Sequence, residues 1–200
     1  MIGPSFSLAP GAWRYAAPAG LLAVPAVFVT PYASAVLLAV AAFTLWFFRD
    51  PEREPPARGV LAPADGRVSV VREEAGRLRV GVFMNVTDVH VNRAPMGGTV
   101  EAVDHRPGAH RPAFTKDSDR NERVRIDFGD HAVDLIAGAF ARRITPYVEM
   151  GDAVERGGRI GHIAFGSRAD VVLPRGYGRT SLEVDEGDRV RAGETVLARR

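Results

Sequence analysis

A Gly-Ser pair near the C-terminus, Gly166-Ser167, carries the residue types best suited to chemistry. It lies between two short runs, 163–165 and 171–173, in which apolar residues alternate as in a half-buried strand. Glycine has no side chain to obstruct a nucleophile that approaches its carbonyl carbon. The Ser167 hydroxyl could therefore attack the Gly166 carbonyl, and elimination and hydrolysis would then leave a pyruvoyl group on a new N-terminus. Because Gly-Ser is also a common turn pair, a plain turn is the competing interpretation.

The composition excludes several other kinds of chemistry. The chain of 200 residues has no cysteine, which excludes disulfides, thiolate catalysis and cysteine-ligated metals. Its single lysine, Lys116, lies in a polar run that is typical of an exposed loop. Enzymes that capture amines through a carbonyl usually need a lysine or a bound aldehyde cofactor. A carbonyl made from the chain itself would remove that need.

Charge and histidine spacing argue against two further classes of site. The formal charge is +2 with an estimated pI of 9.4, and the arginine excess suits anionic lipid headgroups. No basic patch interleaved with aromatic residues is found, so we predict no nucleic-acid partner. Four of the five histidines lack metal-ligand spacing with a nearby carboxylate, so no metal site is predicted; these are His105, His110, His131 and His162.

A long apolar segment occupies the N-terminal quarter of the chain. No charged residue occurs from Ala16 to Phe48, although prolines interrupt the span. It could be a tilted single span kinked at Pro31, a helical hairpin turning near 30–32, or a signal peptide with a cleavage-like site at 33–35. A buried core helix is less favoured, because a helix that is apolar all round has little to pack against in so small a domain.

The organisation that we predict has three parts. Residues 1–48 form an N-terminal membrane-associated segment, and residues 49–58, rich in charges and prolines, form a linker. Residues 59–200 form the folded domain, in which short strands alternate with turns from residue 60 onward.

A repeat in this domain indicates its architecture. The pattern Gly-Asp-x-Val-x-x-Gly occurs at 151–157 and again at 187–193, an offset of 36 residues, and each copy is typical of a hairpin corner. Two such corners suggest the pseudo-symmetric halves of a barrel-like sandwich, similar to biotinyl and lipoyl carrier domains. We therefore predict a mainly β fold: a small antiparallel barrel-sandwich-like domain with few short helices, preceded by an apolar N-terminal helical membrane segment.

Residues 165–174, Phe-Gly-Ser-Arg-Ala-Asp-Val-Val-Leu-Pro, resemble the processing site of the short bacterial and archaeal type of phosphatidylserine decarboxylase. Other stretches match that family in the same order: 46–53, 62–68 and 88–95, with a weaker match at 121–123. The resemblance implies a pyruvoyl-dependent enzyme of the cell membrane, in which phosphatidylserine is decarboxylated to phosphatidylethanolamine. Cleavage would give a large chain, 1–166, and a small pyruvoyl chain, 167–200, which stay together as a heterodimer. A higher homo-oligomer is left open.

The same resemblance implies roles for individual residues. Ser167 is the nucleophile and the source of the pyruvoyl group, with Gly166 on the other side of the cleaved bond. His90 takes the serine proton or assists later proton transfers. Asp65 orients a base by the logic of a hydrolytic triad, although Asp-Gly is also a preferred turn pair.

One departure from the family pattern concerns the base for self-cleavage. Larger members carry a second histidine three residues after the first, but this chain has Arg93 there. Either His90 serves in both steps, or another group is the base for self-cleavage. Arg93 could instead bind the substrate phosphate or carboxylate through a two-pronged contact.

The sequence is also compatible with two alternatives to this function. One is the same chemistry on an ether-linked archaeal analogue of phosphatidylserine. The other is a non-catalytic, membrane-anchored sandwich-domain adaptor, which would remain uncleaved. A carrier domain is disfavoured, because a carrier needs a lysine at its hairpin tip and neither Gly-Asp corner has one.

Overall fold

The computed structural model describes residues 7–108, 121–138, 143–164 and 167–200. Internal contacts divide the chain into two compact units, one ending at Glu52 and the other running from Arg53 to Arg200. The division falls within the linker that the sequence predicts at 49–58.

The first unit is a helical hairpin. It consists of α1 (Ala12–Ala26) and α2 (Pro31–Phe47), and the Ser34 hydroxyl on α2 donates to the Ala23 carbonyl on α1 at 2.9 Å. A short antiparallel pair, β1 (Ser7–Leu8) and β2 (Arg49–Asp50), joins the two ends of the hairpin. Of the three predicted arrangements, the structure has the hairpin.

Capping explains where the second helix begins. The Thr30 hydroxyl oxygen accepts from the Tyr32 amide at 3.3 Å, and Pro31 occupies the first helical position, where its missing N–H is not needed. The earlier prolines, Pro18 and Pro25, lie inside α1 instead of ending it. Among the described residues, no helix combines the length and the apolar character required to cross a membrane.

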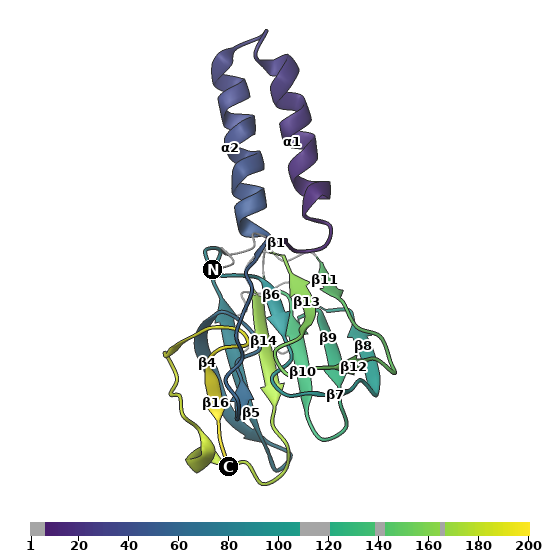
Figure 1. Ribbon diagram of the computed structural model, residues 1–200, viewed down its shortest axis with the longest axis vertical. Coiled ribbons are helices and arrows are strands. Elements are labelled where there is room, and N and C mark those ends of the chain that lie inside the picture. Colours follow the sequence, from purple (N-terminus) through teal and green to yellow (C-terminus); the bar gives the residue numbers. More distant parts are fainter. Residues whose placement is uncertain (1–6, 109–120, 139–142, 165–166) are drawn as a thin grey trace. The chain divides into compact units, whose positions relative to one another are not determined.

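The second unit is mainly β, as predicted, and is built on a seven-stranded antiparallel sheet. The order is β15-β4-β5-β14-β10-β9-β8, so β14 is the central strand, between β5 and β10 (Figure 1). The bounds are β4 Gly66–Glu74, β5 Arg77–Met84, β8 Ala102–Arg106, β9 Arg123–Asp127, β10 Ala132–Ile136, β14 Ser167–Val172 and β15 Arg189–Val190.

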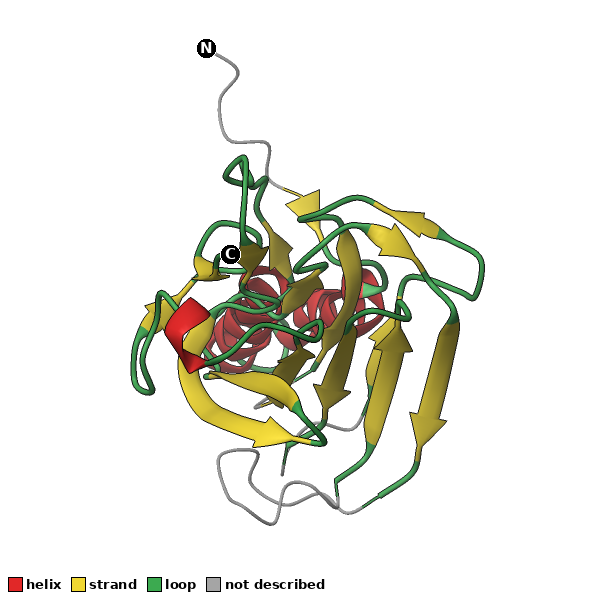
Figure 2. Ribbon diagram, turned by 90° about the horizontal axis from the view of Figure 1, so that it is seen from below, coloured by secondary structure: helices red, strands yellow, loops and turns green. Residues whose placement is uncertain are grey.

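Three smaller antiparallel sheets complete this unit. Their orders are β11-β13-β6, β12-β7 and β16-β3. Figure 2 also shows one short 3-10 turn, Arg179–Ser181, which is the one helical element among the residues that the structure describes in this unit. The bounds are β3 Val60–Leu61, β6 Val91–Arg93, β7 Gly98–Thr99, β11 Ile144–Pro146, β12 Ala153–Val154, β13 Arg159–Ile163 and β16 Val196–Ala198.

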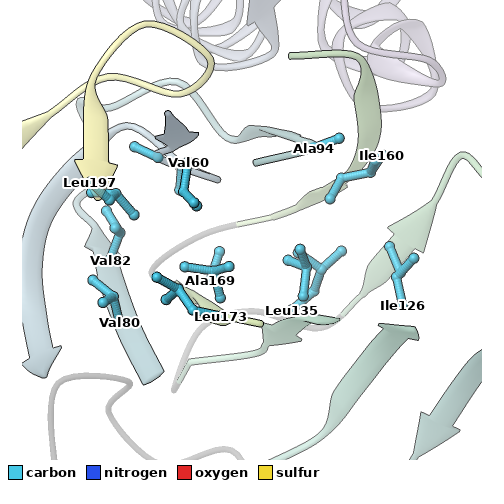
Figure 3. Close-up of a cluster of buried hydrophobic side chains, with 14 of the residues drawn as sticks. Val60, Val80, Val82, Ala94, Ile126, Leu135, Ile160, Ala169, Leu173 and Leu197 are labelled. Carbon is cyan, nitrogen blue, oxygen red and sulfur yellow. The ribbon is translucent and has the colours of Figure 1, made fainter. Parts of the chain in front are cut away.

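The hydrophobic core lies between the large sheet and the smaller ones. Figure 3 shows side chains of the large sheet, including Val82 and Ala169, facing Val60, Ala94 and Ile160 of the opposite layer. Successive side chains of a strand point to opposite faces. Ser167 of β14 and Met84 of β5 therefore share the inner face with Ala169 and Val82, two residues away on the same strands.

The outer face of the large sheet carries a buried network of ion pairs. Arg79 of β5 contacts Asp134 at 2.6 Å and Asp170 at 3.2 Å, and Arg168 contacts Asp170 at 2.7 Å. Burial alone would lower the pKa of Arg79, but the carboxylates of Asp170 and Asp134 outweigh it and raise that pKa. The network therefore neutralises charges that would be costly to bury singly.

The two Gly-Asp corners predicted from the repeat have the same geometry. In the first, the Glu149 amide donates to the Asp152 carboxylate at 2.8 Å, and in the second the Asp185 amide donates to the Asp188 carboxylate at 2.9 Å. Each aspartate closes its own turn in this way. The predicted pseudo-symmetry is confirmed at these corners.

A second repeat, which the sequence analysis missed, pairs with the first. The pattern Ala-Pro-x-x-Gly-x-Val occurs at 62–68 and 94–100. The Val68 amide donates to the backbone carbonyl of Asp188, and the Val100 amide donates to the backbone carbonyl of Asp152, each at 2.9 Å. Equivalent positions of the two Ala-Pro segments thus meet equivalent positions of the two corners.

The Asp65-Gly66 pair is of a preferred turn type, but it does not join two paired strands as a hairpin turn would. β3 pairs with β16 and β4 pairs with β5, and Gly66 is the first residue of β4. Glycine is needed there because its φ is 140° and an added Cβ would collide with the Phe83 carbonyl group. Close strand approach, and not a hairpin turn, explains this glycine.

Replacing Gly66 with alanine should lower the free energy of unfolding by about 3 kcal/mol or more, through backbone strain and the collision with Phe83. Gly76→Ala is the matched control, because Gly76 also has positive φ, 71°, but an added Cβ would meet no atom within 4 Å. We expect it to cost about 1 kcal/mol. Urea-induced unfolding in mild detergent measures both, and equal losses would contradict the explanation.

Candidate active site

Ser167 begins the central strand and is completely buried. It lies opposite Met84 in the β14–β5 register, and its hydroxyl is 3.9 Å from the Met84 sulfur. A thioether is a weak acceptor, so this contact does little to restrain the hydroxyl. Gly166, the other half of the predicted cleavage bond, lies outside the described residues.

His90 is buried just before β6 and has a defined tautomer. Its Nδ1 lies 2.9 Å from the Asp88 carbonyl oxygen, and since a carbonyl can only accept, Nδ1 carries the hydrogen. Nε2 is then the basic nitrogen. The His90 carbonyl accepts from the Ile163 amide at 3.3 Å. This bond joins the segment to β13, which ends at Ile163, four residues before Ser167.

Asn92 is a buried polar residue that the sequence analysis did not assign. Its Nδ2 lies 3.6 Å from the Met84 sulfur and 3.5 Å from the Pro63 carbonyl oxygen. Asn92 and Ser167 therefore contact the same sulfur atom. The signal that could have found Asn92 is its position two residues after His90, in the middle of the buried strand β6.

Asp65 lies on the loop before β4 and is bound by a cation. The Arg53 guanidinium donates to both carboxylate oxygens, at 3.1 and 2.9 Å, and the Ala192 amide donates at 2.8 Å. Burial raises the pKa of Asp65, and the opposing effects of Arg53 and the amide only partly offset it. The contact that orients His90 comes from the Asp88 carbonyl, so the predicted role of Asp65 toward a base stays a prediction.

Arg93, at the position of the family's second histidine, points into the β unit. Its side chain is buried, and its guanidinium donates to the Gly157 carbonyl at 3.1 Å. Its Cδ would lie 2.9 Å from a Cβ added at Gly193. Arg93 thus lies next to the last glycine of each repeat copy, Gly157 and Gly193. The predicted contact with a substrate phosphate or carboxylate stays a prediction.

One carbonyl group links the predicted segments. The Pro63 oxygen accepts from the Arg93 amide at 2.9 Å as well as from the Asn92 side chain. The loop that carries Asp65 is thereby joined to the strand that carries Asn92. The structure thus brings three of the predicted sequence stretches, 62–68, 88–95 and the start of 167–174, into one buried region.

A small pocket lies next to this region. Its volume is about 210 Å³, and its lining includes Asp88, Arg67 and Arg189. Arg189 contacts the Asp88 carboxylate at 3.2 Å, and Arg67 donates to the Gly187 carbonyl at 2.9 Å. Two guanidinium groups at its lining would suit an anionic headgroup.

The other described histidines have structural partners. The Nε2 of the exposed His105 lies 2.8 Å from a Glu122 carboxylate oxygen, and His131 stacks on Phe128. His162 is buried, and its Nδ1 lies 2.8 Å from the Tyr147 hydroxyl. Among the described residues there is no group of three histidine or carboxylate side chains that could hold a metal ion.

Comparison with known proteins identifies relatives that match most of the chain. The family model described as phosphatidylserine decarboxylase matches residues 40–198. The chain is 58% identical to the "Putative archaetidylserine decarboxylase proenzyme" of Halobacterium salinarum, over 95% of this chain and 97% of the relative. It is 53% identical to the "Phosphatidylserine decarboxylase proenzyme" of Thermobifida fusca, over 82% of this chain and 76% of the relative. No solved structure matches the chain.

Burial of His162 predicts a pH dependence of stability. Burial lowers the pKa of this histidine to about 4, below the value of about 6.5 in the unfolded chain. The unfolded state therefore binds more protons between these values, so the contribution is complete above pH 6.5 and is lost as the pH falls toward 4. The loss should be on the order of 3 kcal/mol.

Urea-induced unfolding at pH 7 and pH 4.5 measures this effect. His162→Gln should flatten the difference in unfolding free energy between the two pH values. His105→Gln, at an exposed histidine, is the control and should leave the difference as in the wild type. A wild-type slope in the His162 variant would show that this group does not titrate as described.

Proposed function

The chain belongs to the phosphatidylserine decarboxylase family, and from that membership we propose that it decarboxylates a serine phospholipid after cleaving itself between Gly166 and Ser167. The observation that carries this proposal is the buried Ser167 at the start of the central strand, in one region with His90 and the matched motifs. The word "proenzyme" in the names of the relatives supports processing of those proteins.

The residues around Ser167 fit a pyruvoyl group. When that group forms, the serine side chain loses its oxygen and becomes a methyl group. The Met84 sulfur, which now contacts the hydroxyl at 3.9 Å, offers a methyl group an equally suitable apolar surface. The pyruvoyl group would supply the carbonyl that withdraws electrons as carbon dioxide leaves the substrate.

We assign the proton transfers to His90. Its Nε2 is the basic nitrogen because the Asp88 carbonyl engages Nδ1. In the proenzyme, Nε2 would accept the proton of the Ser167 hydroxyl, and in the processed enzyme it would return a proton to the substrate carbon. The Asp88 carbonyl holds the Nδ1 hydrogen in both steps, while Nε2 is unprotonated when it accepts the proton and protonated when it returns one.

The two chains would stay together after cleavage. The small chain, 167–200, would begin with β14, which is hydrogen-bonded on both sides to strands of the large chain, β5 and β10. Its Asp170 is bound by Arg79 of the large chain at 3.2 Å. Removing one partner of a buried ion pair is strongly unfavourable, so these contacts favour a stable heterodimer.

The lipid tails distinguish two candidate substrates. The Halobacterium relative is named for archaetidylserine and the Thermobifida relative for phosphatidylserine, at 58% and 53% identity. The serine headgroup is common to both, and the pocket with Arg67 and Arg189 would hold its anionic groups. Phosphatidylserine is the substrate that the family name supports, and the ether-linked analogue is the second candidate.

We place the enzyme at the cell membrane through residues 1–48. Side chains near the hairpin turn are apolar and exposed, with exposed fractions of 88% for Phe28, 84% for Val29 and 81% for Tyr32. With 17 residues, α2 would reach about 26 Å, less than the ~30 Å of a bilayer core. These features favour insertion into one leaflet.

Intact mass of the purified protein tests self-cleavage. We expect two fragments that meet at Gly166 and Ser167, the smaller lacking the ammonia of an N-terminal serine and reacting with phenylhydrazine. Ser167→Ala should give one chain. A single uncleaved wild-type chain would instead support the adaptor alternative. Carbon dioxide release from liposomes of phosphatidylserine or its ether-linked analogue then separates the two substrates.

Deletion of residues 1–48 tests the membrane assignment. The shortened chain should still cleave itself, because the β unit contains every residue of the proposed site. It should no longer float with liposomes, and its turnover of liposomal substrate should fall at least tenfold. Turnover of a short-chain, water-soluble substrate is the control and should be retained. Normal turnover on liposomes would refute the assignment.

A further inference from the structure

Asn92 has one side-chain atom whose hydrogen-bonding capacity is unused. The residue is completely buried, and both hydrogens of its Nδ2 have an acceptor nearby, the Pro63 carbonyl oxygen at 3.5 Å and the Met84 sulfur at 3.6 Å. Its Oδ1 is also buried but has no partner among the residues that the structure describes. An unpaired buried acceptor is costly, so its retention calls for a donor from elsewhere.

The amide orientation is set by its surroundings. A carbonyl oxygen only accepts, so exchanging the nitrogen and oxygen of Asn92 would bring two acceptors together at Pro63. The free atom is therefore the oxygen, and the site needs a donor and not an acceptor.

A shared contact connects the Asn92 side chain to the predicted reaction centre. The Met84 sulfur that contacts Nδ2 of Asn92 also contacts the Ser167 hydroxyl, at 3.6 and 3.9 Å respectively. Of the described residues that hydrogen-bond to this sulfur, only Ser167 carries a hydroxyl. Self-cleavage removes that hydroxyl, because its oxygen leaves with the new carboxylate of Gly166. The processed site would thus keep the unpaired acceptor of Asn92 and lose the hydroxyl of Ser167.

The substrate would bring a donor to this place. In the proposed function, the amino group of the serine headgroup must approach the carbonyl carbon derived from Ser167, and an amino group carries N–H donors. We infer that Asn92 Oδ1 accepts a hydrogen bond from this amino group and orients its lone pair toward the carbonyl carbon. This inference rests on the proposed function and makes Asn92 a further catalytic residue.

A neutral amide suits this task better than a carboxylate. A carboxylate would bind the amino group in its protonated form, which has no lone pair for attack. An amide oxygen can hold the neutral amine by one hydrogen bond. Binding and reactivity should therefore respond differently to substitution at Asn92.

The experiment measures binding to processed protein whose ketone has been reduced with borohydride, so that no turnover occurs. Glycerophosphoserine is titrated calorimetrically into the wild type, Asn92→Leu and Asn92→Asp. The leucine variant removes the oxygen at nearly constant shape and should bind about tenfold more weakly. The aspartate variant keeps an acceptor and should bind at least as tightly as the wild type, while unreduced Asn92→Asp decarboxylates more slowly.

Glycerophosphoglycerol, which has no amino group, is the matched control ligand. It should bind the wild type and both variants alike. Weakened binding of both ligands would assign Asn92 a structural role and overturn the inference, as would wild-type affinity for glycerophosphoserine in Asn92→Leu. If the leucine variant does not fold, weaker glycerophosphoserine binding by Asn92→Asp would overturn it.

Self-cleavage separates this inference from the proposed function. Both variants should be processed to the wild-type extent, as judged by intact mass. A wild type that stays uncleaved would refute the proposed function itself. Normal processing of the wild type with failed processing of both variants would place Asn92 in the cleavage step, and the inference about the amino group would be wrong.

Discussion

Two hydrogen bonds exchange partners between the Ala-Pro segments of the β unit, from the Leu61 amide to the Pro95 carbonyl and from the Arg93 amide to the Pro63 carbonyl, each at 2.9 Å. Buried amides and carbonyls must be paired, so these reciprocal bonds hold the two pseudo-symmetric segments in contact. The site depends on them directly. The Pro63 carbonyl also binds the Asn92 side chain, so a shift of either segment would move Asn92, which contacts the same Met84 sulfur as Ser167.

The central strand must stay in place when the bond at its beginning is cut. Its inner side chains, such as Ala169, pack in the hydrophobic core, and its outer carboxylate Asp170 is held by Arg79 and Arg168. Burying these charges is costly, but loss of one partner would leave the others uncompensated. The network therefore serves to hold β14 in place more than to add net stability. The reactive group at the start of this strand must be held in place after cleavage.

The sequence predicted local features well and long-range pairing poorly. Alternation placed Ser167 next to a buried strand, and the Gly-Asp corners followed from residue types within ten positions of one another. The pairing of β3 with β16 joins residues more than 130 positions apart, which no local pattern specifies. Asn92 was missed for a similar reason, because its contacts are with Met84 and Pro63, which lie outside its own strand. The ion pair between Asp65 and Arg53 is likewise not evident from the local sequence.

The replacement of a second histidine by Arg93 is explained by the groups around it. Arg53 engages both oxygens of Asp65, and Arg93 donates to Gly157 beside the corner glycines. A triad through Asp65 would need a neutral base beside this carboxylate. This chain has Arg53 beside Asp65 and Arg93 at the position of the second histidine, and arginines remain charged at any working pH. His90 is then the described histidine best placed for both chemical steps, and the Asp88 carbonyl provides the fixed tautomer that an aspartate would provide in a triad. The proposed assignment of both proton transfers to His90 agrees with the pairing of Asp65 with Arg53.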